Sequence, residues 1–231
     1  MPLTRIVLLT GAGVSAESGL GTFRDAGGLW TRYALDDVAT PEGFARNPAL
    51  VQEFYNARRA DMRAAHPNAA HHALARLQQS WPDRVTLVTQ NIDDLHERAG
   101  SPDVIHMHGE LGRARCATCD HRWPAPDRMS TTDTCPACKA RATRPDVVWF
   151  GEFPVHMERI AVALAEADLF VAIGTSGAVY PAAGFVAEAA ANGARTLEIN
   201  LTPSDTADAF DDSLLGPATE TVPAWVASLL D

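Results

Sequence analysis

The chain lacks the features that mark membrane-spanning and nucleic-acid-binding proteins. It has no uninterrupted apolar run of about 18 residues, so no helix is expected to cross a bilayer. Lys139 is the only lysine, and 19 basic residues face 29 acidic ones, which gives a formal net charge of −10. That charge opposes general binding to nucleic-acid backbones. Cysteine is also scarce, and all 4 cysteines lie between residues 116 and 138.

The remaining composition is that of an ordinary globular protein. Apolar residues make up 46% of the 231 residues and charged residues 21%, which excludes disordered, collagen-like and coiled-coil classes. This length allows one domain that carries a smaller insertion. Because the apolar run Ile6–Leu9 begins so close to Met1, no room is left for a signal peptide, and we expect a cytoplasmic protein.

The pattern of apolar residues predicts an α/β fold. Short runs rich in Val, Ile and Leu indicate buried strands, and apolar positions at near-helical spacing indicate helices between them. Such alternation predicts a doubly wound, Rossmann-type parallel sheet. The expected strands are 6–10, 85–90, 147–150, 169–174 and 196–201, and the expected helices are 67–81, 157–167 and 92–99, the last with Asn91 as its N-cap.

Ligands of such sheets bind at the carboxyl ends of the strands, so Gln90, Asn91 and Asp93 are expected in a cleft. Two stretches interrupt the α/β pattern. We therefore predict one domain whose large lobe comprises 1–32, 83–111 and 146–231. The small lobe comprises a helical insertion, 33–82, and a zinc ribbon, 112–145, in which basic residues outnumber acidic ones.

The cysteines form two knuckles, Cys116-x2-Cys119 and Cys135-x2-Cys138. Two such knuckles supply the four thiolates of a closed tetrahedral zinc site. A cytoplasmic location disfavours the alternative of two disulfides, and the four-thiol spacing disfavours an isolated redox pair. A closed site has no open position for substrate, so we predict one structural Zn²⁺ that takes no part in catalysis. A zinc-ribbon module that binds nucleic acid is the rival interpretation.

A glycine-rich turn, Gly11-Ala12-Gly13-Val14-Ser15, follows the first expected strand. Backbone N–H groups in such a turn can face a pyrophosphate. A tight connection without a ligand has the same pattern, and the acidic residue that grips ribose in ordinary dinucleotide folds is ambiguous here, with only Asp36 and Asp37 in range. The turn alone therefore does not establish a nucleotide site.

Taken together, the motifs resemble those of the sirtuins, the NAD-dependent protein lysine deacylases, in order and spacing over essentially the whole chain. The resemblance rests on residues 11–24, Gln90-Asn91-Ile92-Asp93, His108-Gly109, the four cysteines, Val147–Glu152, Gly174-Thr175-Ser176 and Asn200-Leu201. It implies that NAD is consumed as a co-substrate. It also implies a set of NAD-binding residues: Gly11, Ala12, Gly13, Ser15, Glu17, Gly21, Thr22, Phe23, Arg24, Trp30, Gln90, Asn91, Ile92, Asp93, Gly174, Thr175, Ser176, Asn200, Leu201 and Ala218.

The resemblance assigns catalysis to His108 and Asn91, with His108 as the base. A neutral imidazole is available near pH 7 to accept a hydroxyl proton. His106-x-His108 is also compatible with a metal pair, but the thiolates already complete the metal site. His71, His72 and His106 are interpreted as structural or surface residues.

Tyr55-x-x-Arg58 is similar to the pair that in class III sirtuins contacts the carboxylate of succinyl- or malonyl-lysine. Residues three apart on a helix share a face, and arginine offers a bidentate fork to a carboxylate. The alternative is an exposed arginine beside a core tyrosine. The resemblance also implies that Val148, Phe150 and Gly151 lie in a strand that pairs with an extended substrate peptide.

The function predicted is therefore NAD-dependent removal of succinyl, malonyl or acetyl groups from lysines of proteins or peptides. The products would be nicotinamide, 2′-O-acyl-ADP-ribose and free lysine. The alternatives are an NAD-dependent oxidoreductase with a structural zinc and a zinc-ribbon binding module. Release of nicotinamide without reduction of the nicotinamide ring distinguishes the deacylase from both.

Overall fold

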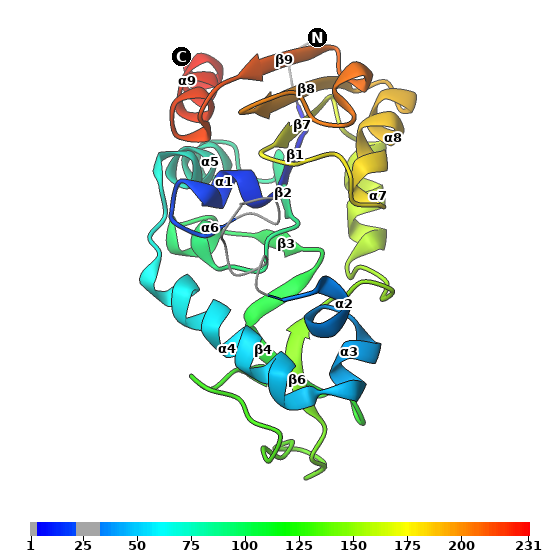
Figure 1. Ribbon diagram of the computed structural model, residues 1–231. Helices are drawn as coiled ribbons and strands as arrows, with labels where there is room; N and C mark the ends of the chain where they lie inside the picture. Colours follow the sequence, from blue (N-terminus) through cyan, green and yellow to red (C-terminus); the bar gives the residue numbers. More distant parts are fainter. Residues whose placement is uncertain (1–3, 22–32) are drawn as a thin grey trace.

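The computed structural model describes residues 4–21 and 33–231, which form two lobes (Figure 1). A six-stranded parallel sheet forms the large lobe, with strand order β3-β2-β1-β7-β8-β9. This confirms the predicted fold class. The strands are β1 (Ile6–Thr10), β2 (Val85–Thr89), β3 (Val104–His106), β7 (Leu169–Ile173), β8 (Arg195–Asn200) and β9 (Asp212–Leu215).

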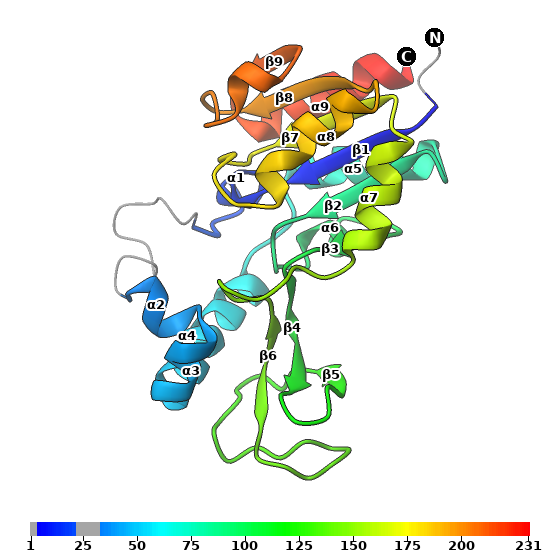
Figure 2. The ribbon, with the colours of Figure 1, turned by 90° about the vertical axis from the view of Figure 1, so that its right-hand side faces the viewer.

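Alternate side chains of the central strands enter apolar clusters on opposite faces of the sheet. Ile6 and Leu8 of β1 pack on one face with α5 (Ala69–Ser80) and α9 (Ala218–Leu230). Val7 and Leu9 pack on the other with α7 (Met157–Ala165) and α8 (Phe185–Ala191). Figure 2 shows the sheet between these helices. Because both faces are covered, β1 and β7 are apolar and buried along nearly their whole length.

Shorter helical segments connect these elements: α1 (Ala12–Ala16), α6 (Leu95–Arg98) and the 3₁₀ turns η2 (Ala182–Gly184) and η3 (Ala207–Ala209). The helix predicted over 92–99 is wrong at its start, because α6 begins at Leu95 and its N-cap is Asp94. The Ile92 carbonyl is engaged outside the helix, since Leu111 N–H donates to Ile92 O over 2.7 Å. Asn91 is therefore not a helix cap.

In the small lobe, α2 (Leu35–Val38), α3 (Pro41–Arg46) and α4 (Pro48–Ala64) lie beside a three-stranded antiparallel sheet of order β5-β4-β6 (Figure 2). Its strands are β4 (Gly109–Cys116), β5 (Arg122–Pro124) and β6 (Thr143–Val147). Helix α5, which falls within the predicted helical insertion 33–82, packs against α9 and the parallel sheet.

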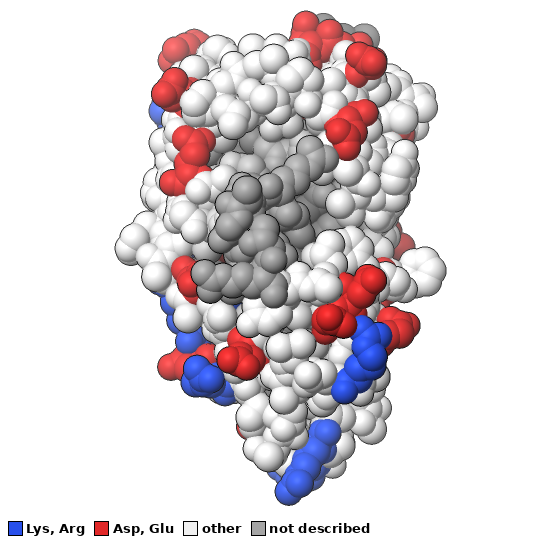
Figure 3. Space-filling model, viewed as in Figure 1, with Lys and Arg blue, Asp and Glu red and all other residues white. Residues whose placement is uncertain are grey.

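The strand predicted over 147–150 is also displaced: β6 ends at Val147. Residues 148 and 149 are not in a regular element and 150 and 151 form a turn, and backbone amides of this segment donate to other segments. Val148 N–H donates to His108 O and Phe150 N–H to Ala39 O, both over 2.9 Å. The segment thus ties the two lobes together. On the face shown in Figure 3, most basic side chains gather over the small lobe, where acidic side chains lie among them.

Candidate active site

The loops that follow β1 and β7 meet at the carboxyl edge of the parallel sheet. Gly13 N–H donates to Gly174 O over 2.8 Å, and Gly174 has a φ of 61°. A Cβ atom on Gly13 would lie 2.8 Å from Gly174 Cα, so neither position accepts a side chain without moving the backbone. The predicted glycine-rich turn therefore forms the start of α1, in close contact with the loop after β7.

Three of the predicted residues form one buried polar cluster beside this turn. The Asn91 side-chain amide donates to Gly11 O over 3.0 Å and to Ser15 Oγ over 3.2 Å. Ser15 Oγ in turn donates to Asp93 Oδ2 over 3.1 Å. Burial raises the pKa of Asp93, although hydrogen bonds from Leu95 N–H and Ser15 oppose that shift. The cluster fixes an amide, a hydroxyl and a carboxyl group where two chain segments converge.

Buried histidines contact this cluster or one another: His71 and His106, which the sequence analysis interpreted as structural or surface residues, and His96, to which it gave no role. His71 is fully buried, with Nε2 3.4 Å from Ser15 Oγ, whereas His72 beside it is exposed. The buried His96 ring lies 4.9 Å from the His71 ring, and its Nε2 is 3.0 Å from Thr10 Oγ1. His106 is buried as well and contacts Asn91 O through Nδ1. Sequence periodicity gave no signal for these contacts, which join residues distant in the chain.

His108 lies on the other side of the same segment, just before β4. Its Nδ1 is 3.0 Å from the carbonyl oxygen of Gln90, which as an acceptor fixes the proton on Nδ1. Nε2 is then the unprotonated nitrogen, and within the described part of the chain it has no hydrogen-bond partner. Burial lowers the pKa of His108 below its usual value, with the Gln90 contact opposing this. The ring therefore carries a neutral basic nitrogen near neutral pH.

The remaining predicted NAD-binding residues lie along the same edge. Gln90 Nε2 donates to Thr175 Oγ1 over 3.0 Å, and Asn200 Nδ2 donates to Thr175 O over 2.8 Å. Leu201 is largely exposed, and Ser176 Oγ accepts from the backbone N–H of Ala178 over 3.3 Å. These contacts link the ends of β2, β7 and β8.

Glu17 has a different environment from the one its expected role suggests. Its carboxylate accepts from the backbone N–H of Thr219 over 3.1 Å and also from the Thr219 hydroxyl. Thr219 follows Ala218 in the first turn of α9, where a carboxylate is favourable. Gly21 is exposed, whereas Thr22, Phe23, Arg24 and Trp30 lie outside the described residues.

Tyr55 and Arg58 lie one turn apart on α4. The Tyr55 ring is buried in the core of the small lobe, packed edge to face against Phe54 with ring centroids 5.1 Å apart. Arg58 is partly exposed, and its guanidinium carbon lies 6.0 Å from the Phe54 ring centroid. Burial lowers the pKa of Arg58, while its electrostatic interactions with Tyr55 and then Asp93 oppose the shift. Arg58 therefore interacts electrostatically with Asp93, one member of the polar cluster.

The residues expected to contact a peptide lie on the segment after β6. Phe150 is about half exposed, and Gly151 has a φ of 87°. The amides of Val148 and Phe150 already donate within the chain. Backbone pairing of this segment with a peptide would therefore have to use other polar groups of residues 148–151.

The four cysteine sulfurs converge, and all lie within 4.8 Å of one another. Cys116 Sγ is 3.6 Å from Cys138 Sγ, and Cys119 Sγ is 3.7 Å from Cys135 Sγ. A tetrahedral zinc ion with Zn–S bonds of about 2.3 Å places its sulfurs about 3.8 Å apart. The sulfurs form no disulfides. The four thiols are thus positioned for a metal ion, and the set matches the preference of zinc.

Among the described residues, no helix is long and apolar enough to cross a membrane.

Comparisons with known proteins agree with this geometry. A family model described as the Sir2 family matches residues 11–181. An NAD-dependent protein deacylase of Caulobacter vibrioides is 60% identical over 99% of this chain and 98% of its own length. The deacylase of Escherichia coli K12 is 54% identical over 100% of this chain and 84% of its own length.

Solved structures give the same result. The crystal structure of a Sir2 homologue in complex with NAD covers 99% of this chain and 90% of that chain, with a TM-score of 0.91 and 38% identity. A mutant Sir2 homologue in complex with 2′-O-acetyl ADP ribose covers 99% of this chain and 92% of that chain, with a TM-score of 0.89 and 37% identity.

Proposed function

This chain belongs to the Sir2 family and is an NAD-dependent protein deacylase, and we propose that it removes succinyl and malonyl as well as acetyl groups from lysine side chains. The observation that carries the proposal is the Tyr55–Arg58 pair on α4. A partly buried guanidinium beside a buried phenol suits an acyl group that ends in a carboxylate. An acetyl group has no such terminus.

The position of the pair supports the proposal. Arg58 interacts electrostatically with Asp93, which supports a position of the acyl end of the substrate near the polar cluster formed by Ser15, Asn91 and Asp93. We assign that cluster to the ribose and nicotinamide of NAD. The loop contact of Gly13 with Gly174 would face the phosphates, and Thr175, Ser176, Asn200, Leu201 and Ala218 would line the adenosine side.

His108 is the proposed catalytic base. NAD supplies the electrophilic ribose carbon, from which nicotinamide leaves when the acyl oxygen attacks. His108 Nε2 would then accept the proton of a ribose hydroxyl as that hydroxyl oxygen attacks the carbon of the resulting imidate, since Nδ1 is committed to the Gln90 carbonyl. Water enters to give free lysine and 2′-O-acyl-ADP-ribose. The lowered pKa of His108 keeps this nitrogen unprotonated at neutral pH.

We also propose a cytoplasmic location, because the free cysteines and their metal-binding geometry suit a reducing compartment. The partners are acyl-lysine proteins or peptides. The small lobe carries many arginines, but several are paired with acidic residues, such as Arg122 with Asp120 and Asp146. That pairing weakens the case for a nucleic-acid-binding ribbon.

Replacing Arg58 with Met tests the acyl assignment. We expect kcat/KM for a succinyl-lysine peptide to fall by roughly 10² or more, and kcat/KM for the acetyl peptide to fall far less, because only the succinyl group presents a carboxylate. Arg63→Met is the matched control, since Arg63 lies on the same helix but pairs with Asp127 at the surface. Equal losses on both peptides with Arg58→Met would show that Arg58 does not contact the acyl carboxylate.

A further inference from the structure

The Tyr55 hydroxyl is held by Trp149, a residue of the same apolar cluster in the small lobe. Trp149 Nε1 donates a hydrogen bond to Tyr55 Oη over 2.8 Å, and the two side chains are 3% and 1% exposed. A phenol oxygen that accepts a hydrogen bond keeps its own hydrogen for a different acceptor. In a buried site, accepting one bond also polarises the hydroxyl as a donor. The indole therefore restricts where the Tyr55 hydrogen points.

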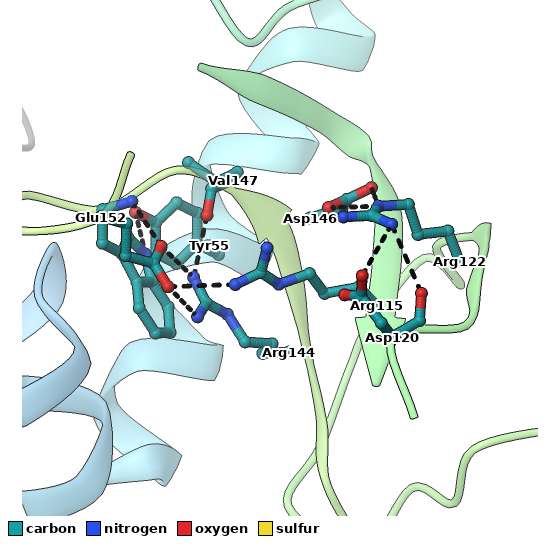
Figure 4. A network of polar contacts seen from close by, with 9 residues as sticks. Tyr55, Arg115, Asp120, Arg122, Arg144, Asp146, Val147 and Glu152 are labelled. Atoms are coloured by element: carbon teal, nitrogen blue, oxygen red, sulfur yellow. Dashed lines mark hydrogen bonds and ion pairs between the residues drawn. The ribbon is translucent and has the colours of Figure 1, made fainter. Parts of the chain in front are cut away.

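Trp149 is itself fixed by a partly buried ion pair, that of Arg144 with Glu152. Its backbone N–H donates to Glu152 Oε2 over 2.8 Å, and the Arg144 guanidinium carbon lies 3.4 Å from its ring centroid. Arg144 binds both oxygens of Glu152, over 2.6 and 2.8 Å, and donates to Val147 O over 2.9 Å. Figure 4 shows the Arg144 and Arg115 guanidiniums directed at the Glu152 carboxylate, close to Tyr55.

The charge of this pair persists in its buried setting. Burial opposes ionisation of Glu152, but hydrogen bonds from Arg144 and Trp149 N–H more than offset it, so its pKa is lowered. Arg144 is 5% exposed and has its pKa lowered by burial, with Glu152 opposing the shift. A bidentate, ionised pair of this kind holds a defined geometry, whereas removal of one partner leaves an uncompensated buried charge.

We propose that Trp149 is a positioning residue for acyl selectivity: its indole N–H orients the Tyr55 hydroxyl so that the hydroxyl hydrogen is donated to the carboxylate of a succinyl or malonyl group. The Arg144–Glu152 ion pair keeps Trp149 in the position this requires. The inference rests on the proposed function of Tyr55 and Arg58 and extends it to residues that do not contact the acyl group. An acetyl group gains nothing from this orientation.

A double-mutant cycle tests the inference. The quantity measured is the ratio of kcat/KM for succinyl-lysine to kcat/KM for acetyl-lysine on one peptide. Trp149→Phe and Tyr55→Phe should each lower this ratio by about three- to tenfold, the loss expected for one neutral hydrogen bond. The double variant should lower it no further than Tyr55→Phe alone, because the hydroxyl on which Trp149 acts is already absent. Effects that multiply, or a Trp149→Phe variant with equal losses on both peptides, would overturn the proposal.

Two further variants keep the test decisive. Glu152→Gln leaves the indole in place but breaks the ion pair, and it should lower the same ratio, though not in the Tyr55→Phe background. Glu152→Gln therefore replaces Trp149→Phe if the smaller ring does not fold, and an unchanged ratio contradicts the proposal. Trp123→Phe, on β5 and stacked on His121, is the control for loss of an indole.

The Arg58→Met result separates the two proposals. A selective loss with Arg58→Met but not with Trp149→Phe refutes only the positioning role. An unchanged ratio with Arg58→Met refutes the carboxylate contact and, with it, the positioning role that depends on that contact.

Discussion

The parallel sheet and the small lobe are stabilised in different ways. In the sheet, β1 and β7 are buried on both faces by apolar helices. The small lobe has a smaller apolar cluster around Phe54, Tyr55 and Trp149. Its helices are joined to the ribbon largely by buried polar contacts. The large lobe is therefore stabilised mainly by burial of apolar surface, and the small lobe depends more on a limited number of buried hydrogen bonds.

Arg59 illustrates these directed bonds. Its side chain is fully buried and donates to Leu111 O over 3.1 Å, Asn56 Oδ1 over 2.8 Å and Met129 Sδ over 3.4 Å. Burial lowers its pKa to about 10. Asn56 Nδ2 also donates to Met129 O over 2.8 Å. These bonds join α4 to the segment between the cysteine knuckles, so the metal site and the helix that carries Arg58 depend on each other.

Removing one thiolate should produce the largest difference between the lobes. Cys135→Ala leaves an open, weaker site, and structural zinc commonly contributes about 10–16 kcal/mol of binding free energy in small zinc domains. We expect zinc content to fall and the ribbon to become sensitive to protease while the parallel sheet stays resistant. Metal analysis with limited proteolysis measures both. Chelated wild type should recover on zinc addition, and a Cys135→Ala protein that keeps metal and protease resistance would contradict the metal assignment.

Replacing the proposed base should have the opposite effect: activity should be lost while both lobes stay folded. His108→Ala should lower deacylation by about 10²- to 10⁴-fold, the usual contribution of a general base. Nicotinamide exchange should survive, since that step precedes proton removal. His72→Ala, an exposed histidine on α5, is the control. Full deacylation by His108→Ala, with unchanged thermal unfolding, would exclude the role.

Acid should weaken the large lobe through its buried histidines. Burial lowers the pKa of His71 to about 4 and that of His96 well below its usual value. The unfolded chain then binds more protons than the folded one between pH 6.5 and 4, so the free energy of unfolding falls as pH falls through that window. The expected loss is about 3 kcal/mol from His71 alone.

The check is denaturant unfolding at several pH values. His71→Gln should flatten the dependence on pH whatever its effect at neutral pH, whereas His72→Gln should leave the slope unchanged. Equal slopes for wild type and His71→Gln would show that His71 is not held neutral by the fold.

The sequence predicted the large lobe better than the small one, because strands buried in the large lobe leave continuous apolar runs in the sequence. Continuous apolar runs marked β1, β2, β7 and β8, and the cysteine spacing anticipated the four-thiol cluster. Strand β6 was misplaced because its Thr-Arg-Pro-Asp-Val sequence is mostly polar. Strand β9 is exposed at all 4 positions and carries no burial signal.

For the site, the sequence predicted which residues take part but not the contacts between residues that are remote in the chain. The sequence predicted Gln90, Asn91 and Asp93 at the carboxyl ends of the strands, and in the structure Asn91 and Asp93 share a hydrogen-bond network with Ser15. The helix-cap role of Asn91 was wrong because Gly11 O and Ser15 Oγ, which are remote in sequence, accept its amide. The Trp149 contact with Tyr55 spans 94 positions. No local pattern reports such a pairing.

The most direct test of the account is mass spectrometry of one peptide carrying succinyl, malonyl or acetyl lysine, incubated with the wild-type enzyme with and without NAD. We predict NAD-dependent loss of each acyl mass, with one nicotinamide and one acyl-ADP-ribose formed per lysine released and no absorbance from reduced nicotinamide. Removal of acetyl alone, with the succinyl and malonyl peptides unchanged, would contradict the proposed contact of Tyr55 and Arg58 with an acyl carboxylate.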